Sequence, residues 1–467
     1  MTAPSPLGAT LRHSTTGIEA RSAGAHRNWV LAALLAVYVC NFIDRTLLSV
    51  LQQPIMDELH LTDWQLGLLG GPSFALFYAA LGIPIARLAE RHNRVTIISI
   101  ALALWSGMTA LCGFASSYAQ LFLFRVGVGI GEAGCTPPAQ ALISDYFEPR
   151  RRTTAMAVYS LGVPAGILFG AMLGGFVAER YGWRAAFLIM GAPGLLLAII
   201  VKLTIREPRR GAADEKDLQS IAEIVPGIRD VCRTMWSDRA LRHVTIGSAL
   251  SSLSGYGIAA FGATYFMRAF ELGPARAGFI AGIASGISCG TGTLLGGVLA
   301  DRAGRSNRGW YGWLPAIGLI VCVPLYLLAF SQPTLAWAAA TFAVPGIFHY
   351  LYLGPTYGVL HNRISSRERA TASALLILVM SLIGLGIGPP LVGALSDATA
   401  HQVFAAGDYA TACLGRDANL ATACRMASAS GLRVGLSACV LVFLWAALHF
   451  YWVGRALVRR QRDTSAA

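Results

Sequence analysis

Charged residues are scarce in this sequence of 467 residues, at 13% of the chain against 55% for hydrophobic residues. Soluble domains carry roughly 25% charged and 45–50% apolar residues. Apolar runs of about 20 residues recur throughout, and each is long enough to cross roughly 30 Å of hydrocarbon. The shortage of charge therefore excludes a soluble protein built from several cores, and it predicts an all-α membrane protein.

Lysine is almost missing, with only Lys202 and Lys216, so arginine supplies most of the formal net charge of +13. The arginines fall in short clusters between apolar runs rather than along one helix face with interleaved aromatic residues. This placement favours membrane topology over nucleic-acid binding. The preference for arginine is typical of a GC-rich bacterial genome, so we expect a multi-pass protein of the bacterial inner membrane.

Two further features are missing. The first 27 residues contain no short apolar stretch followed by a small-residue cleavage site, so we expect a cytoplasmic tail rather than a cleaved leader. The sequence also lacks the clustered His or Asp residues that a membrane-embedded enzyme would need at an interface. We therefore expect no enzyme activity, no metal and no cofactor.

Twelve apolar runs have the length of a membrane span, and a polar segment divides them into two sets of six. This segment carries Asp214, Glu215, Lys216 and Asp217 and is too polar for hydrocarbon. The expected organisation is an N-terminal tail at 1–28, a bundle at 29–205, a linker at 206–242 with an amphipathic helix around 221–235, a second bundle at 243–454 and a tail at 455–467. The expected spans are 29–54, 64–86, 95–115, 119–143, 153–178, 184–204, 243–269, 277–299, 311–331, 335–360, 370–395 and 433–453.

Most of the basic residues fall on the face that carries both termini and the linker, so both termini are predicted to be cytoplasmic. A repeat supports the division into halves, because the stretch from Ala86 to Arg94 after the second span is matched by Gly297 to Arg305 after the eighth. Such a repeat indicates two related six-helix bundles with the transport site between them.

These two stretches resemble the G-x-L-A-D-R-x-G-R signature of the major facilitator superfamily, the second fully and the first with Ala86, Glu90 and Asn93 at three positions. In that family the acid faces a helix N-terminus of the opposite half, and the arginines meet an acid at the end of the fourth span. The resemblance implies a cytoplasmic gate that breaks when this side opens, formed by Glu90, Arg91, Arg94, Asp145, Asp301, Arg302 and Arg305.

Two spans, the first and the fourth, carry acid and arginine residues deep in hydrocarbon, where each costs roughly 2.5–3.5 kcal/mol and therefore needs a partner or a task. Asp44 and Arg45 are in the first span, and Arg125 and Glu132 are two helical turns apart on the fourth. Glycines between them leave room for another helix to approach. A carboxylate whose arginine partner moves can change its proton affinity, so this group predicts proton coupling. The alternative is a fixed ion cluster that only positions helices.

Four segments together resemble the Spinster branch of the superfamily: Asn41 to Arg45, Arg125 to Ala133, Ser144 to Phe147, and Arg369 to Asp397. The resemblance implies proton-linked carriage of lysophospholipids and sphingosine phosphate. It also implies that the acid–arginine motif of the branch lies at Asp44, Arg45, Arg125 and Glu132. The expected partners are a small amphipathic molecule, protons and the lipid bilayer, with no nucleic acid, and the expected state is a monomer.

Other candidates follow from residue type and position. Aromatic and polar residues of the inner spans are candidates for the substrate cavity: Asn41, Phe74, Tyr78, Tyr159, Tyr256, Phe261, His349, Tyr350 and Tyr357. Small residues and prolines are candidates for hinges or close packing: Gly162, Pro164, Gly166, Gly388 and Pro389. Cys413 and Cys424 share an expected external loop and are candidates for a disulfide.

The predicted function is proton-coupled transport of an amphipathic organic anion, with a lysophospholipid or sphingolipid-like substrate first. Two alternatives remain open. One is a proton-coupled carrier of small aromatic or sugar acids, or a drug efflux carrier. The other is a receptor or scaffold that transports nothing, in which the acids inside spans would be dispensable.

Overall fold

The computed structural model describes residues 7–210, 227–365, 368–414 and 418–466, and this part of the chain is helical with no strand. The N half, as we call it, contains α1 (Leu7–Leu59), α2 (Asp63–Gly70), α3 (Pro72–Arg91), α4 (Arg94–Cys112), α5 (Tyr118–Glu132), α6 (Thr136–Tyr146), α7 (Pro149–Ser160) and α8 (Gly162–Thr204). The C half contains α9 (Ile228–Ser237), α10 (Arg239–Phe270), α11 (Pro274–Gly304), α12 (Trp310–Phe330), α13 (Leu335–Tyr350), α14 (Leu353–Arg363), α15 (Arg369–Met380), the π-helix Ser381–Leu385, α16 (Gly386–Val403), the short π-helix Ala410–Leu414, the 3-10 helix Ala418–Leu420, and α17 (Ala421–Ala466).

Nine stretches of the described residues are long and apolar enough to cross a membrane. Twelve spans were predicted, and local breaks explain the difference. The stretch Thr154–Thr204 holds two spans, because α8 reverses at Gly182, whose φ of 84° suits a residue without Cβ. The spans near 119–143 and 335–360 are each broken into two helices of fewer than 18 residues, at 133–135 and at 351–352. Twelve spans in two sets of six are thus confirmed.

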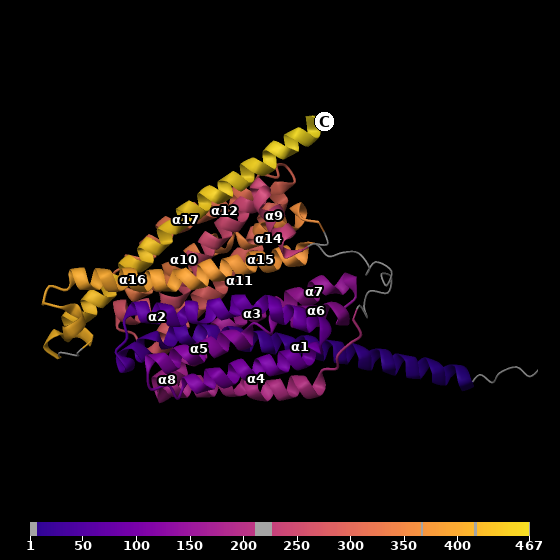
Figure 1. The fold of residues 1–467 in the computed structure, drawn as a ribbon, viewed down its shortest axis with the longest axis horizontal. Helices are drawn as coiled ribbons and strands as arrows, with labels where there is room; N and C mark the ends of the chain where they lie inside the picture. The colour runs from indigo at the N-terminus through magenta and orange to yellow at the C-terminus, as the bar shows by residue number, and fades with distance from the viewer. Residues whose placement is uncertain (1–6, 211–226, 366–367, 415–417, 467) are drawn as a thin grey trace, which may run out of the picture.

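The two halves form separate bundles that lie side by side (Figure 1). Both chain ends point to the same end of the molecule, which we call the terminal face. The opposite end, the far face, carries the connections at 60–62, 113–117, 271–273 and 331–334. α1 begins at Leu7, well before the expected start of the first span at residue 29. Of the expected linker helix, α9 covers Ile228–Ser237, whereas 211–226, with Asp214, Glu215, Lys216, Asp217 and Ile221, lies outside the described residues.

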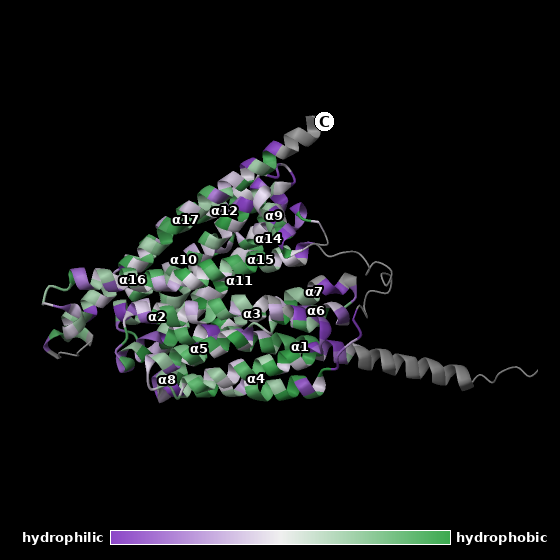
Figure 2. Cartoon of the chain, in the orientation of Figure 1, coloured by the Kyte–Doolittle hydropathy of each residue, from purple (hydrophilic) through white to green (hydrophobic). Residues whose placement is uncertain are grey.

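Hydrophobic residues predominate along the helices of both bundles, and hydrophilic residues gather toward the two ends (Figure 2). Large hydrophobic side chains are exposed along the spans, for example Leu203 at 79% and Leu294 at 71%. An exposed apolar surface of this extent marks contact with lipid rather than with water. The fold is therefore that of a multi-pass membrane protein.

Candidate functional site

The four ionisable residues predicted inside spans come together in the N half. Asp44 and Arg45 lie in the middle of α1, and Arg125 and Glu132 lie on α5. Asp44 and Arg125 are 2% exposed and Glu132 is 0% exposed, whereas the Arg45 side chain is 20% exposed. Arg45 is thus the member of this cluster that is open to a ligand from the space between the halves.

Arg45 is held by one carboxylate and three aromatic rings. Its Nε donates to Glu132 Oε2 at 2.7 Å. Its guanidinium carbon lies 5.1 Å from the ring centre of Phe42, 4.7 Å from that of Phe74 and 4.8 Å from that of Tyr78. A guanidinium stacks on aromatic faces while its edge hydrogen-bonds a carboxylate, which a lysine cannot do equally well.

Several polar atoms of the cluster are buried without a hydrogen-bond partner in the described part of the chain. They include the Nε and Nη1 atoms of Arg125. Thr109 and Trp105 of α4 lie within hydrogen-bonding reach of Asp44, and Asn41 lies within reach of Glu132. Buried polar groups in folded proteins are nearly always satisfied. The cluster can therefore accept protons, water or the polar atoms of a ligand.

Glycines of α5 set the position of this cluster. A Cβ on Gly129 would lie 2.8 Å from Phe74 O, and a Cβ on Gly131 would lie 2.7 Å from Trp105 N. Both neighbours are backbone atoms, so α5 approaches α3 and α4 as closely as a helix can. The close approach that the sequence predicted thus brings Phe74 under Arg45 and Trp105 toward Asp44.

The helix breaks lie at equivalent places in the two halves. α5 ends at Glu132, and its fourth-span continuation α6 starts at Thr136; in the tenth span, α13 ends at Tyr350 and α14 starts at Leu353. The carbonyl end of a helix carries a partial negative charge, so Arg45 beside Glu132 is favourably placed at the end of α5. Interrupted spans at matching positions of two repeats are typical of transporter binding sites.

The structure brings together only some of the predicted cavity residues. Tyr78, Tyr256 and Tyr357 lie close enough to interact electrostatically, and the first two also do so with Arg45. Phe74 contacts Arg45 and stacks on Tyr78 with ring centres 5.3 Å apart. Phe74 and Tyr78 come from the N half and Tyr256 and Tyr357 from the C half, so residues of both halves gather near Arg45.

The remaining cavity candidates are packed elsewhere. Tyr159 is 1% exposed and stacks on Tyr38 at 4.4 Å between ring centres. Phe261 is fully buried in the core of the C half. His349 is 3% exposed between Tyr350 and Phe443, with ring centres 4.5 Å and 4.6 Å away. In this conformation these side chains serve packing.

On the terminal face, part of the predicted gate is paired within its own half. Arg94 contacts Asp145 and Glu207, each at 2.6 Å. Asp301 accepts a hydrogen bond from Tyr311 at 2.6 Å, also within one half. The other predicted members, Glu90, Arg91, Arg302 and Arg305, have exposed side chains.

On the far face, polar contacts join the two halves. Arg268 of α10 pairs with Asp63 of α2 at 2.6 Å and 2.7 Å, and Ser396 donates to the same carboxylate at 2.6 Å. Asp397 of α16 accepts from the backbone nitrogens of Asp63 and Trp64 at 3.0 Å and 2.8 Å. It therefore caps the positive N-terminus of α2 across the interface.

A second carboxylate repeats this arrangement. Glu179 of α8 accepts from the backbone nitrogen of Ala275 at 2.9 Å, at the N-terminus of α11. The fifth and eleventh spans thus each cap a helix of the opposite half. Several polar contacts join the N half to the C half. Where both partners are described, these contacts lie toward the far face.

The predicted hinge glycines lie at close helix contacts. A Cβ on Gly162 would lie 2.9 Å from Tyr38 Cβ, and Gly166 abuts Phe42 on the same helix, α1. Gly388, next to the buried Pro389, abuts Leu253 of α10, while Pro164 is half-buried.

Cys413 and Cys424 form a disulfide. Within the described ranges, no group of three or more His, Cys, Asp or Glu residues could hold a metal ion.

Sequence reasoning missed the far-face residues Asp63, Glu179, Arg268 and Asp397. The sequence did contain a signal for Arg268, because this residue falls inside the expected span 243–269. In the structure its side chain is only 5% exposed. Asp397 ends one of the segments that resembles the Spinster branch. Asp63 and Glu179 lie at span ends, where acidic residues are ordinary.

Comparison with known proteins identifies the family. The family model described as Major Facilitator Superfamily matches residues 34–405. An "MFS-type efflux pump" of Mycolicibacterium smegmatis is 32% identical over 82% of this chain and 87% of its own. The "Sphingosine-1-phosphate transporter SPNS2" of Danio rerio is 27% identical over 77% of this chain and 74% of its own.

Solved structures give the same result. The crystal structure of a bacterial homologue of the human lysosomal transporter Spinster, in an inward-facing and unoccupied conformation, is 37% identical and covers 93% of this chain and 98% of its own, with a TM-score of 0.84. A second crystal structure of a bacterial Spinster homologue, in an inward-facing and occupied conformation, is 36% identical. It also covers 93% of this chain and 98% of its own, with a TM-score of 0.80. This chain belongs to the Major Facilitator Superfamily, in its Spinster-like branch, and is a membrane transporter rather than an enzyme.

Proposed function

We propose that this transporter is a proton-coupled carrier of an amphipathic organic anion, and that a lysophospholipid or related lipid is the first candidate substrate. The observation that carries the proposal is the buried cluster of Asp44, Arg45, Arg125 and Glu132, in which two carboxyl groups that are at most 2% exposed share two arginines. An ionised carboxylate that is buried without a partner costs several kcal/mol. A proton, a water or an arginine must satisfy it.

The contacts of Arg45 suggest how substrate and proton exchange. A phosphate or carboxylate that enters on the exposed side of Arg45 competes with Glu132 for the guanidinium. Once Glu132 loses this ion pair, its buried carboxylate is less well stabilised and takes up a proton. One proton is thereby taken up for each anion that binds. The cluster with its bound anion then carries the same net charge as the empty cluster.

The aromatic surroundings favour an amphipathic substrate. Tyr78 and Tyr256 lie near Arg45, and Tyr357 lies near both tyrosines, so a ligand at Arg45 would meet aromatic rings beside one cationic group. An anionic headgroup with an attached chain fits this combination. The names of the similar SPNS2 and Spinster proteins support the same substrate class.

The polar contacts between the halves support alternating access. They hold the far face closed, whereas the gate residues Glu90 and Asp301 do not contact the opposite half among the described residues. Movement of the halves would break the far-face contacts and form gate contacts on the terminal face. We place the terminal face in the cytoplasm of a bacterial cell, because most basic residues lie there, and we propose that the carrier works as a monomer.

The test is proton movement in proteoliposomes that contain a pH-sensitive dye. Addition of a lysophospholipid should move protons through the wild-type protein, and Glu132→Gln should abolish this signal. Asp408→Asn, which removes an exposed carboxylate on the far face, is the matched control and should keep it. Equal signals from Glu132→Gln and wild type would refute the coupling.

Efflux of another amphipathic compound is the second candidate, because the Mycolicibacterium smegmatis relative is described as an efflux pump. The same vesicles distinguish the candidates when lysophospholipids, sugar acids and amphipathic drugs are added in turn. A proton signal with drugs alone would reject the lipid assignment and leave the proton cluster in place.

A further inference from the structure

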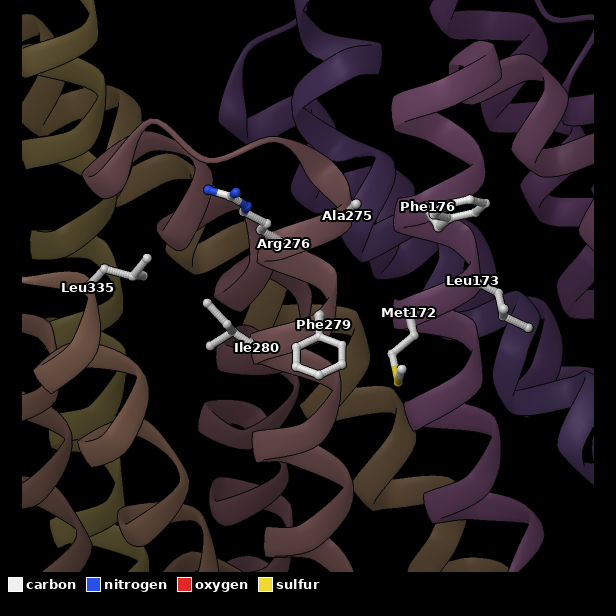
Figure 3. A pocket seen from close by; sticks show the side chains of 8 residues that line it. All are labelled: Met172, Leu173, Phe176, Ala275, Arg276, Phe279, Ile280 and Leu335. Atoms are coloured by element: carbon white, nitrogen blue, oxygen red, sulfur yellow. The ribbon is translucent and has the colours of Figure 1, made fainter.

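A groove of about 480 Å³ lies on the lipid-facing surface between α8 and α11, toward the far face (Figure 3). Met172, Leu173 and Phe176 line it from α8, and Phe279 and Ile280 line it from α11. Leu173, Phe176 and Phe279 are 47%, 58% and 48% exposed, so their apolar surface is not covered by the protein itself. The volume lies within the roughly 300–1,000 Å³ of small-molecule sites.

The floor of the groove is closed. Gly175 abuts Pro274 O, and Gly278 abuts Ala171 O, so the backbones of the two helices touch beside the groove. Because no side chain separates these backbones, the groove does not open into the interior of the transporter in this conformation. Its occupant must therefore come from the surrounding bilayer.

Among the described residues that line the groove, Arg276 is the one that is charged. It is the third residue of α11, where a cation is unfavourable next to the positive end of the helix. Its side chain is exposed and forms no ion pair with any acid in the described ranges, since nearby Glu179 bonds Ala275 N instead. Figure 3 shows the guanidinium on the rim, with Phe279 and Ile280 further along the helix toward the membrane interior.

We propose that this groove binds one phospholipid of the leaflet on the far face, with an acyl chain against the apolar wall and the phosphate on Arg276. A charged rim at the membrane boundary above an apolar trough matches a lipid and does not match a free anion. α8 and α11 belong to different halves, so a lipid that bridges them favours the closed far face. This consequence rests on the proposed alternating access; the binding itself does not.

The test is the number of phosphatidylglycerol molecules that stay bound after detergent exchange, measured by native mass spectrometry. Wild type should retain one molecule more readily than it retains diacylglycerol, which has the same chains and no phosphate. Arg276→Gln should lower phosphatidylglycerol affinity about fivefold, the equivalent of the roughly 1 kcal/mol that one surface cation contributes. Arg425→Gln removes another exposed arginine of the far face and should leave the affinity unchanged.

A second variant tests the trough. Phe279→Ser should lower retention of both lipids, because it removes a ring from the apolar wall. Equal phosphatidylglycerol retention in Arg276→Gln and Arg425→Gln, or unchanged retention in Phe279→Ser, would overturn the proposal. Glu132→Gln should still retain phosphatidylglycerol more readily than diacylglycerol, so loss of proton coupling and loss of this site give different results.

Discussion

Arg45 combines an ion pair, three aromatic contacts and partial exposure, and no other residue of the described chain has this set of contacts. Its neighbour Asp44 is buried on the opposite side, toward Trp105 and Thr109. The two residues are adjacent in sequence, so they point to different sides of α1. In the proposed mechanism, Arg45 meets the substrate and Asp44 does not.

Arg45→Lys should reduce transport at least tenfold, the equivalent of about 1.4 kcal/mol. An ammonium cannot stack on Phe42, Phe74 and Tyr78 while its edge bonds Glu132. Arg184→Lys is the matched control, because Arg184 stacks on Trp183 at 4.1 Å and pairs with Glu58 at the far face. Initial uptake rates in proteoliposomes measure both, and equal rates would argue against a special role for Arg45.

At the scale of helices, α5 depends on glycine for its contacts with α3 and α4. Gly131→Ala should destabilise the protein by about 1–3 kcal/mol, because the added Cβ meets the backbone of Trp105. Gly386→Ala has nothing within 4 Å of the added Cβ, so it should leave stability unchanged or raise it by up to about 1 kcal/mol. Thermal melts in detergent compare the two, and equal melting temperatures would refute the packing argument.

The start of α10 should make stability depend on pH. Asp238 accepts from the backbone nitrogens of Ala240 and Leu241 at 2.8 Å and 3.1 Å and from Arg363 Nε at 3.0 Å. Burial raises the pKa of Asp238, but these hydrogen bonds outweigh burial and leave the pKa below its usual value. A lowered folded-state pKa gives stability that is complete above the ordinary Asp pKa and is lost as the pH falls through the folded one.

Melting temperatures measured from neutral pH down to about pH 3 check this prediction. Wild type should lose stability at the acid end, and Asp238→Asn should start lower and lose less over the same range. Parallel curves for the two proteins would show that this cap does not contribute to the pH dependence.

At the scale of the whole molecule, the far-face contacts hold the two halves together. Arg268→Gln should shift the protein toward an open far face, because it leaves Asp63 buried without its cation, at a cost of about 3–5 kcal/mol in the closed state. Spin labels on the exposed residues Ser116 and Ser331, one in each half, should move apart. Arg425→Gln should not change the distance, and an unchanged distance in Arg268→Gln would contradict the gate.

The sequence predicts the spans and the buried cluster because both are local signals. An apolar run of fixed length and an ionisable residue inside it are visible without knowing the fold. The far-face network is different: Arg268 is 205 positions from Asp63, and Asp397 is 333 positions from Trp64. These residues lie at span ends, where charges are common, and only the docking of the two halves pairs them.

The groove beside Arg276 could not be predicted for the same reason. Its two walls come from different halves, and its shape depends on the close contact of Gly175 with Pro274. The predicted cavity aromatics divide similarly, since Tyr256 approaches Arg45 whereas Phe261, five residues later, faces the core. Residue type identified the candidates, and helix rotation selected among them.

The most direct test of the central claim is the far-face distance between Ser116 and Ser331 as a function of pH, measured by electron paramagnetic resonance in a background without the free cysteines. Protons bound at Asp44 and Glu132 should change the balance between open and closed far faces, so the wild-type distance distribution should shift between about pH 5 and about pH 8. The double variant Asp44→Asn, Glu132→Gln should show one distribution at every pH. A shift of the same size in the double variant would contradict the account, because the proton that moves the halves would then bind elsewhere.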